Sequence, residues 1–262
     1  MSQSRPLALI TGASAGIGAE FARQLAATHD LILVARRADR LDAVARELSS
    51  RGCHAQSLAA DLGTSSGCDL VAARLSAEPP IALLINNAGF GARGPFWELP
   101  LDEQLRMHDL HVTATLRLTH AALAAFVPRG RGAVINVASV AAYVRGAGSA
   151  SYCATKSWMT ALTEGIALDL RRRRSAVTIQ ALCPGFTYSE FHDVMGSRRE
   201  TLAGRSFWLQ ASDVVAASLA GLRRRRVFVV PSWRYRLIVA FASRLPNGLR
   251  LAAESARGRR QK

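Results

Sequence analysis

The chain has 262 residues, 49% of them hydrophobic, so it can bury a substantial core without disulfides or structural metals. It contains no uninterrupted run of about 18 apolar residues, which argues against a membrane-spanning helix. The net charge of +15 favours solvated surface arginines first, contact with an anionic surface second and specific nucleic-acid binding least, because the arginines form separate groups at 171–174, 223–226 and 257–260. We therefore expect no nucleic-acid partner.

Short apolar strands alternate with amphipathic helices along the chain. In order, the pattern predicts a strand at 7–11, a helix at 16–28, a strand at 31–35, a helix at 40–50, a strand at 55–59, a helix, a strand at 81–86, a helix at 101–126, a strand at 133–138, a helix at 151–174, and strands at 177–182 and 227–230. Strands that are apolar on both faces and separated by helices indicate an α/β fold, a single doubly wound Rossmann-type domain with a parallel sheet of about seven strands. We expect this domain over residues 1–250 and a basic, disordered tail over 251–262.

The first predicted strand leads into a glycine-rich segment that opens the first helix. Glycines at this place allow a tight turn and a close approach of the backbone to a pyrophosphate, whose charge the helix N-terminus stabilises. The position between strand and helix favours a dinucleotide loop over a purely structural turn. Its residues are Thr11, Gly12, Ala13, Ser14, Ala15, Gly16, Ile17 and Gly18.

The second predicted strand ends at Arg36 and Arg37, where a dinucleotide-binding fold selects its cofactor. An acidic residue there binds a ribose 2′-hydroxyl, whereas arginine accommodates a 2′-phosphate. The first carboxylate is Asp39, so the two arginines favour NADP(H) over NAD(H), and Ser14 adds a possible hydroxyl contact. The alternative is that both arginines are simply solvated.

Tyr152 and Lys156 lie four residues apart on a predicted helix, so both side chains project from one face. A tyrosine has a reference pKa of about 10, and acid–base work near neutrality requires roughly 3 units, or about 4 kcal/mol, of preference for the phenolate. The lysine ammonium and a positively charged nicotinamide ring would supply it. Asn87, Ala88 and Gly89 follow the fourth strand and Ser139 follows the fifth, so all these groups are expected at one edge of the sheet.

These motifs together resemble the short-chain dehydrogenase/reductase family over nearly the whole chain. The matching segments are TGASAGIG at 11–18, Asp61-Leu62, NNAG at 86–89, Ser139 thirteen residues before Tyr152, YCATK at 152–156, and Pro184-Gly185 after the sixth strand.

The resemblance implies a role for each matching residue. Tyr152 would be the general acid for carbonyl reduction and the base for alcohol oxidation, Ser139 would hydrogen-bond the substrate oxygen, and Lys156 would hold the nicotinamide ribose and lower the tyrosine pKa. Asp61 and Leu62 would border the adenine, Asn87 would line the ribose, and Thr187 with Ser189 would lie near the carboxamide. The further cofactor-binding residues would be Ala88, Gly89, Pro184 and Gly185.

One position departs from the family. Where an asparagine usually completes a tetrad and holds a relay water, this chain has His111. A histidine can bind water or carry a proton itself. We expect a modified, working relay. The alternatives are slow or vestigial activity, and a merely structural histidine. Asn136 on the neighbouring strand is interpreted as a packing residue.

Residues 186–210 correspond to the family's variable substrate lid. Its aromatic and apolar side chains favour an apolar substrate, although half of them would serve only to pack the lid. Arg198, Arg199 and Arg205 could meet an anionic substrate but are better explained as surface charge. The lid side chains are Phe186, Tyr188, Phe191, Met195, Phe207 and Trp208, and the opposite wall would comprise Phe90, Phe96, Trp97 and Tyr143.

Residues 233–245 form an amphipathic basic helix that fits two roles. It could pack on its own domain or a sister subunit, which we favour, or lie peripherally on an anionic membrane.

Cys53, Cys68, Cys153 and Cys183 show no metal-binding or C-x-x-C spacing, and residues 1–10 do not form a signal peptide. We therefore expect reduced packing cysteines, no metal site and a cytoplasmic protein.

The predicted function is an NADP(H)-dependent oxidoreductase that acts on an apolar carbonyl or secondary alcohol through Ser139, Tyr152 and Lys156. The resemblance also implies a homodimer or homotetramer. The alternative is an NADPH-binding protein, weakly active or non-catalytic because of His111, that serves as an interaction or membrane-surface module.

Overall fold

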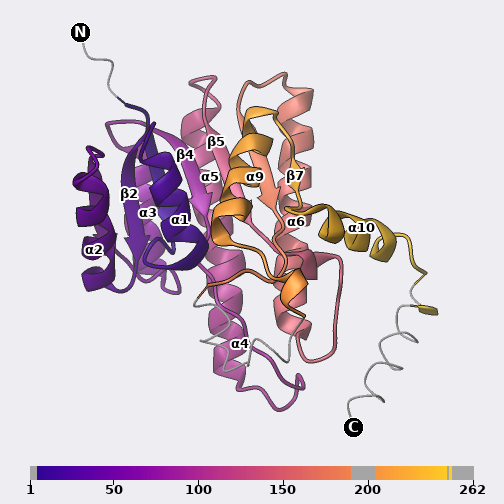
Figure 1. Cartoon of the computed structure of the whole chain (residues 1–262). Helices are drawn as coiled ribbons and strands as arrows, with labels where there is room; N and C mark the ends of the chain where they lie inside the picture. Colours follow the sequence, from indigo (N-terminus) through magenta and orange to yellow (C-terminus); the bar gives the residue numbers. More distant parts are fainter. Residues whose placement is uncertain (1–4, 190–203, 247, 250–262) are drawn as a thin grey trace.

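A computed structural model describes residues 5–189, 204–246 and 248–249, which contain one seven-stranded sheet (Figure 1). The strand order is β3-β2-β1-β4-β5-β6-β7, and every neighbouring pair is parallel. The strands are β1 Leu7–Thr11, β2 Asp30–Ala35, β3 Ala55–Ala59, β4 Ile81–Asn86, β5 Ala133–Val137, β6 Thr178–Leu182 and β7 Phe228–Val229. The predicted Rossmann-type α/β fold is confirmed, and β7 is shorter than the strand expected at 227–230.

Helices cover both faces of the sheet because the strands are apolar on both sides. Ile10 and Leu33 point into one core layer, whereas their neighbours Leu9 and Ile32 point into the other. The first layer packs against α1 (Gly16–Leu25), α2 (Ala38–Ser49) and α9 (Ala211–Arg223), and the second against α3 (Ser65–Ser76), α5 (Thr115–Phe126) and α6 (Ala150–Arg172).

The long helices differ from the predictions at their interruptions and ends. The helix expected at 101–126 consists of α4 (Leu101–His108), a π-helical segment η1 (Asp109–Ala114) and α5. Helix α6 ends at Arg172 rather than 174, because Arg174 has a φ of 52° that an α-helix cannot accommodate. Helix α1 ends at Leu25 rather than 28, in a turn closed by the N–H groups of Thr28 and His29 on the Leu25 carbonyl.

From β1 the chain winds to β2 and β3 on one side of the sheet, and from β4 to β7 it winds on the other side. The direction of winding therefore reverses between β1 and β4. In an open parallel sheet, such a reversal leaves a crevice outside the carboxyl ends of the strands. The segments that follow β1, β4, β5 and β6 therefore converge at one edge, which is the edge at which the sequence motifs stand.

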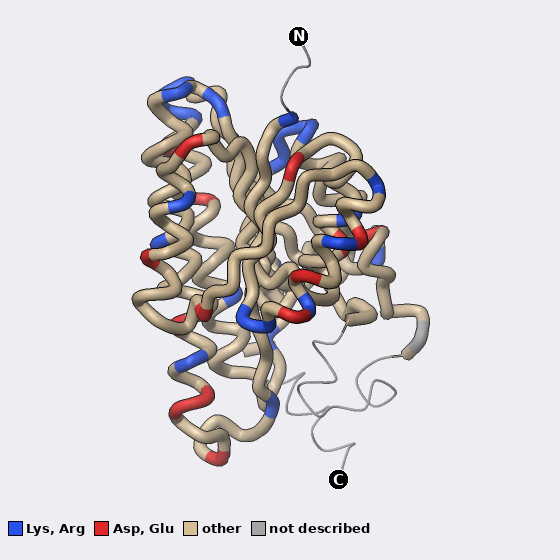
Figure 2. Tube along the Cα trace, turned by 90° about the vertical axis from the view of Figure 1, so that its left-hand side faces the viewer, with Lys and Arg blue, Asp and Glu red and all other residues tan. Residues whose placement is uncertain are grey.

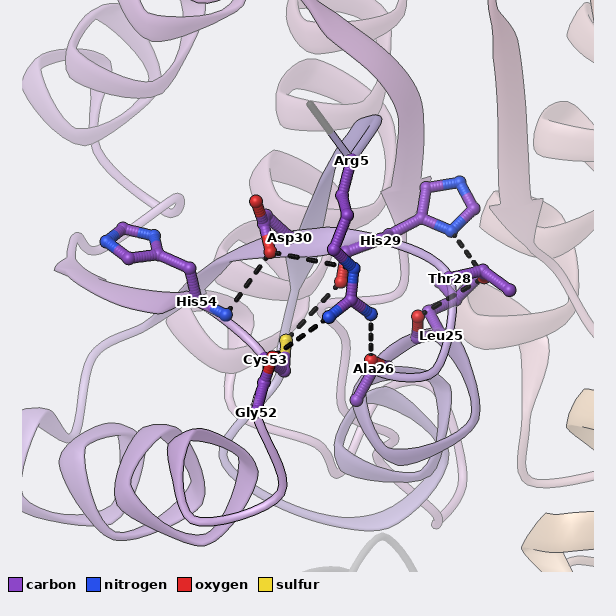
Figure 3. A network of polar contacts seen from close by, with 9 residues as sticks. All are labelled: Arg5, Leu25, Ala26, Thr28, His29, Asp30, Gly52, Cys53 and His54. Atoms are coloured by element: carbon purple, nitrogen blue, oxygen red, sulfur yellow. Dashed lines mark hydrogen bonds and ion pairs between the residues drawn. The ribbon is translucent and has the colours of Figure 1, made fainter. Parts of the chain in front are cut away.

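The opposite edge is tied together by Arg5, ahead of β1 (Figure 3). Its guanidinium donates to the Gly52 carbonyl at 3.0 Å and to the Ala26 carbonyl, and it lies 3.9 Å from the Asp30 carboxylate. The same carboxylate accepts the His54 N–H at 3.2 Å. These contacts join the segments after α1 and α2 to the start of β2, away from the crevice.

The surface charge is not concentrated on one element. Figure 2 shows lysine and arginine at many points over the height of the molecule. No helix within the described residues is long and apolar enough to cross a membrane, and the same residues hold no cluster suited to a metal ion. All four cysteines are free and buried, which confirms their interpretation as packing residues. The tail at 251–262 lies outside the described residues.

Candidate active site

The glycine loop lies between β1 and α1, as predicted. Gly12 and Gly16 have φ values of 65° and 55°, in the left-handed region that favours glycine. A Cβ on Gly18 would lie 2.3 Å from the Gly12 carbonyl oxygen, so the loop closes on the helix only with glycine there. The result is a turn whose backbone lies open at the N-terminus of α1, where an anion is stabilised.

The end of β4 holds this loop in place. The Thr11 hydroxyl accepts the N–H groups of Asn87 at 2.9 Å and Ala88 at 3.0 Å, and donates to the Ile85 carbonyl at 3.2 Å. The Asn87 side-chain amide donates to the carbonyls of Thr11 at 2.9 Å and Gly12 at 3.2 Å. The amide N–H groups of Asn87 thus hold the glycine loop. The sequence predicted only a contact with the cofactor ribose for this residue.

The groups predicted to select the cofactor meet at the carboxyl ends of β1 and β2. The Arg37 guanidinium donates to the Ser14 hydroxyl at 3.2 Å, which joins the end of β2 to the glycine loop. Arg36 is exposed beside it. After β3, one Asp61 carboxylate oxygen accepts the Gly63 N–H at 3.0 Å, and Leu62 is buried. Two arginines and a hydroxyl therefore border the position where a dinucleotide ribose would extend from the loop.

Ser139, Tyr152 and Lys156 converge beyond the end of β5. Ser139 caps a short 3₁₀ turn, η2 (Val140–Ala142), its hydroxyl accepting the Ala141 N–H at 3.1 Å. Burial raises the pKa of the Tyr152 phenol to about 12, and a hydrogen bond with Ser139 lowers it in part. The phenol is therefore protonated at neutral pH and able to donate a proton.

Lys156 lies one helical turn after Tyr152 and is almost completely buried. Its Nζ lies 5.9 Å from the centre of the Tyr152 ring and donates to the Val137 carbonyl at 2.8 Å. Burial lowers the pKa of this lysine from its ordinary value of 10.5 to about 7. The amine is therefore charged only in part at neutral pH. The lowering of the Tyr152 pKa that the sequence predicted from this lysine is not seen, because burial raises that pKa instead.

His111 is buried within η1, and its ring lies 5.9 Å from that of Tyr152. Its Nδ1 lies 3.0 Å from the Thr155 hydroxyl, which in turn donates its only proton to the Tyr152 carbonyl at 3.0 Å. The hydroxyl must therefore accept from Nδ1–H, which leaves a lone pair on Nε2. Burial first, then the charge of Lys156, lowers the His111 pKa well below its usual value, so the ring is neutral.

The free face of the histidine is turned towards the end of β4. His111 Nε2 has no hydrogen-bond partner within the described part of the chain, and a Cβ on Gly89 would lie 2.6 Å from it. The ring therefore fills the space that any side chain at position 89 would need. The acceptor nitrogen is neutral but enclosed, so the predicted relay through His111 stays a prediction.

Only part of the predicted lid falls within the described residues. Thr187 is buried and donates to the Gly185 carbonyl at 3.0 Å. Trp208 is buried with its ring centre 5.5 Å from that of Phe186 and 5.1 Å from that of Tyr188. These three rings pack on one another. Phe191, Met195, Arg198 and Arg199 lie outside the described residues, as does the side chain of Arg205.

The sequence model of the family described as "short chain dehydrogenase" matches residues 6–200 of this chain. The chain belongs to the short-chain dehydrogenase/reductase family. It is thus a Rossmann-fold, NAD(P)-dependent oxidoreductase by family, and the resemblance found from its motifs is confirmed.

Three proteins illustrate the relationship. The gluconate 5-dehydrogenase of Gluconobacter oxydans (strain 621H) is 32% identical over 87% of this chain and 91% of its own length. The solved structure of a short-chain dehydrogenase from Sphingobium yanoikuyae in complex with NADPH has a TM-score of 0.82 and 34% identity, over 92% of this chain and 97% of that one. A bulky-bulky ketone specific alcohol dehydrogenase from Comamonas testosteroni has a TM-score of 0.78 and 28% identity, over 99% and 95%.

Sequence reasoning missed two features of this dehydrogenase/reductase site. Thr155 was not singled out, although it lies inside the YCATK segment, one position before the lysine. Asn136, interpreted as a packing residue, is buried and forms hydrogen bonds on both sides, accepting from Asn86 at 2.9 Å and donating to Thr163 at 3.0 Å. It joins β4, β5 and α6 directly beneath the site.

Proposed function

We propose that this protein is an NADP(H)-dependent oxidoreductase that transfers a hydride between nicotinamide and the carbonyl or secondary alcohol carbon of an apolar substrate. The observation that carries the proposal is the cluster of Ser139, Tyr152 and Lys156 beyond β5, with a protonated phenol hydrogen-bonded to Ser139 and an amine one helical turn away. The glycine loop follows β1 and Ser139 follows β5. Strand β4 lies between these two strands and pairs with both, so the loop and the cluster share one edge of the sheet.

The residues of the crevice fit a dinucleotide. The turn at Gly12 and Gly18 has no room for a Cβ. The N-cap residue Ala15 makes no side-chain cap, so the first N–H groups of α1 can serve a pyrophosphate. The Arg37–Ser14 pair, with Arg36 beside it, supports NADP(H), since arginine recognises a 2′-phosphate. When bound, the nicotinamide supplies the hydride for reduction or accepts it in oxidation.

The protein's own groups handle the proton. Tyr152 donates the phenolic proton to the carbonyl oxygen during reduction, while the Ser139 hydroxyl donates a hydrogen bond to the same oxygen. The ammonium of Lys156 stabilises the phenolate that remains. His111 Nε2 accepts a hydrogen bond from a relay water, with Thr155 fixing the ring's tautomer.

An apolar substrate is supported by the walls around these groups. Phe90 lies 6.3 Å, ring to ring, from His111, and Phe186, Tyr188 and Trp208 form the aromatic cluster of the lid. The similarity to an alcohol dehydrogenase that is specific for bulky-bulky ketones agrees with this class.

The first experiment follows NADPH consumption by the purified protein with apolar ketones, aldehydes and 3-oxoacyl thioesters, with NADH in parallel. We expect turnover with NADPH preferred. The variant Tyr152→Phe should lose turnover by at least about a thousandfold, while its NADPH affinity, measured by fluorescence titration, stays within about twofold. Undiminished turnover in this variant would rule out the mechanism.

Cofactor choice has a separate test. Replacing Arg36 and Arg37 by serine should lower the ratio of kcat/KM for NADPH to that for NADH by about 100-fold, because each charge-assisted hydrogen bond contributes about 1.5–3 kcal/mol. The matched control replaces the exposed Arg171 and Arg172 at the end of α6 by serine and should leave the ratio unchanged. An unchanged ratio in the first variant would reject NADP(H) selection by these arginines.

A second candidate function follows from the buried, neutral His111. A chain with an impaired relay would bind NADPH with little or no turnover and serve as an interaction protein. His111→Asn separates the two candidates. We expect the rate to fall, because the histidine is held by Thr155 in a defined tautomer. A large gain in rate would instead favour the second candidate, an NADPH-binding protein whose catalysis His111 impairs.

The same proposal includes a cytoplasmic location and a homodimer or homotetramer. Leu105, Leu116 and Leu168 are exposed on the two long helical segments and support association through them. Light scattering from the purified protein measures the mass directly, and a monomer at micromolar concentration would contradict the assembly.

A further inference from the structure

Helix α10 (Trp233–Ala242) is fixed to the domain by its inner face. Tyr235 is buried against Gly185, where a Cβ would come within 2.0 Å of its ring. Its hydroxyl donates to the Phe207 carbonyl at 2.8 Å and accepts the Phe186 N–H at 3.1 Å. The predicted packing of this helix on its own domain is therefore confirmed for one face.

The outer face of the same helix is apolar and uncovered. Trp233, Leu237 and Phe241 recur every four residues and are 60%, 62% and 68% exposed. At about 100° per residue, they form one stripe on the side away from Tyr235. Figure 1 shows α10 standing out from the layered body beyond β7, which agrees with the exposure of these three side chains.

Arginines border the stripe on both sides. Arg236 and Arg234 are exposed and stand on opposite flanks of the stripe by the same helical geometry, and the exposed Arg244 follows one turn beyond Ala240, whose carbonyl it binds at 3.0 Å. Arg234 also lies 5.5 Å from the Trp233 ring. The surface thus combines large apolar side chains with long cationic ones.

The partner of this surface must be negatively charged. Residues 214–253 contain eight arginines and no aspartate or glutamate. A second copy docked face to face on α10 would bring arginine against arginine, and residues 214–253 hold no acidic group to neutralise them. An anionic bilayer supplies both an apolar layer for the stripe and phosphates for the arginines, and Trp, Phe and Leu beside arginine is the composition of interfacial helices.

We propose that α10 docks this protein on anionic lipid headgroups, with Trp233, Leu237 and Phe241 at the boundary of the acyl region and the flanking arginines on the phosphates. Arginine side chains are long enough to reach the headgroups while their stems cover apolar surface. The proposal does not depend on the oxidoreductase activity, since binding is measured without turnover.

The test is flotation of the purified full-length protein with two kinds of vesicle. One is phosphatidylcholine alone, and the other contains about 30 mol% phosphatidylglycerol to give a strongly anionic surface. We expect binding to the anionic vesicles alone. Changing Trp233, Leu237 and Phe241 to serine should lower the partition coefficient at least about tenfold, from the lost burial of apolar area. These side chains are exposed, so the fold should be retained, as a matched thermal unfolding curve would verify.

The electrostatic part has its own matched pair. Replacing Arg234, Arg236 and Arg244 by glutamine should weaken binding by about 100-fold, because each arginine near an anionic surface contributes about fivefold. The control changes the exposed Arg171, Arg172 and Arg173 to glutamine, which removes the same charge from the end of α6. We expect a far smaller loss in this control.

Three results would overturn the proposal. These are absence of binding to anionic vesicles, an equal loss in the α6 control, and an α10 variant that loses oligomer mass in light scattering without vesicles. The second result would indicate general charge attraction, and the third would assign the face to a second copy of the chain.

Discussion

We predict that the buried charge of Lys156 lowers the free energy of unfolding of this protein. Its ammonium is buried, and the lysine pKa falls from 10.5 to about 7. Each unit of pKa shift corresponds to about 1.4 kcal/mol, so burial of the charge costs about 5 kcal/mol below about pH 7, where the lysine is charged in both the folded and the unfolded state. The variant Lys156→Met removes this charge while keeping a side chain of similar length.

The net effect is smaller than the full cost. Methionine leaves the Val137 carbonyl without its donor, at a cost of about 1–3 kcal/mol. We therefore expect Lys156→Met to raise the free energy of unfolding by about 2 to 4 kcal/mol at pH 6, in the absence of cofactor. The same variant should lose turnover.

The sign of the pH dependence follows from the lowered pKa. Between about pH 7 and 10.5 the unfolded lysine carries a proton that the folded one has released, so wild-type stability rises with pH through this window. The penalty is complete below about pH 7 and vanishes above 10.5. The advantage of Lys156→Met should therefore shrink steadily as the pH rises from 7 to 10.

Urea unfolding of both proteins at several pH values between 6 and 10 measures this difference. Tyr152→Phe is the matched control. Its phenol has a raised pKa, so it is protonated in both states below about pH 9, and its stability difference from wild type should not change with pH there. A Lys156→Met variant that is less stable than wild type at pH 6, or a difference that stays constant with pH, would refute the reasoning.

Three further substitutions test the geometry of the structure. Gly18→Ala should abolish NADPH binding in calorimetry, because its Cβ would meet the Gly12 carbonyl at 2.3 Å. The control Gly165→Ala, whose Cβ would have nothing within 4 Å, should leave the affinity unchanged. Equal affinities in the two variants would show that the glycine loop does not bind the cofactor. Thr155→Val should lower the free energy of unfolding by about 1–3 kcal/mol by leaving His111 Nδ1–H without an acceptor, and Thr155→Ser should not; equal effects would show that the hydroxyl plays no such part. Tyr235→Phe should cost about 1–3 kcal/mol in urea through its two hydrogen bonds, and no change would place α10 on the domain by packing alone.

The fold follows from sequence because its strands are buried on both faces. Runs such as residues 7–11 and 81–86 are apolar without alternation, and glycine or polar residues end each of them. The helical period also placed α6 to within two residues at each end. It did not reveal η1, because one extra residue in a helical turn changes the period too little over six residues to be visible in an apolar pattern.

The order of the motifs predicted which groups meet, and hydrogen bonding decided what they do. Position alone put Asn87 beside the cofactor, whereas the structure shows its amide holding Thr11 and Gly12. The Thr155–His111 contact joins residues 44 apart, so nothing in local sequence indicates it. For α10, the amphipathic pattern could not say which face packs, because Tyr235 and Trp233 are both aromatic and only one meets Gly185.

Two of the three buried polar side-chain atoms that lack a partner among the described residues lie at the crevice edge of the sheet, and the third, Ser57 Oγ, lies in β3. His111 Nε2 and Asn86 Oδ1 are buried without partners among the described residues, and Lys156 is buried with its charge opposed by its surroundings. Each such group lowers stability by about 1–3 kcal/mol or more. Two well-packed apolar layers flank them and offset these costs. A core that was optimised only for folding would replace these groups, so their presence at one edge is itself an argument that this edge was selected for chemistry.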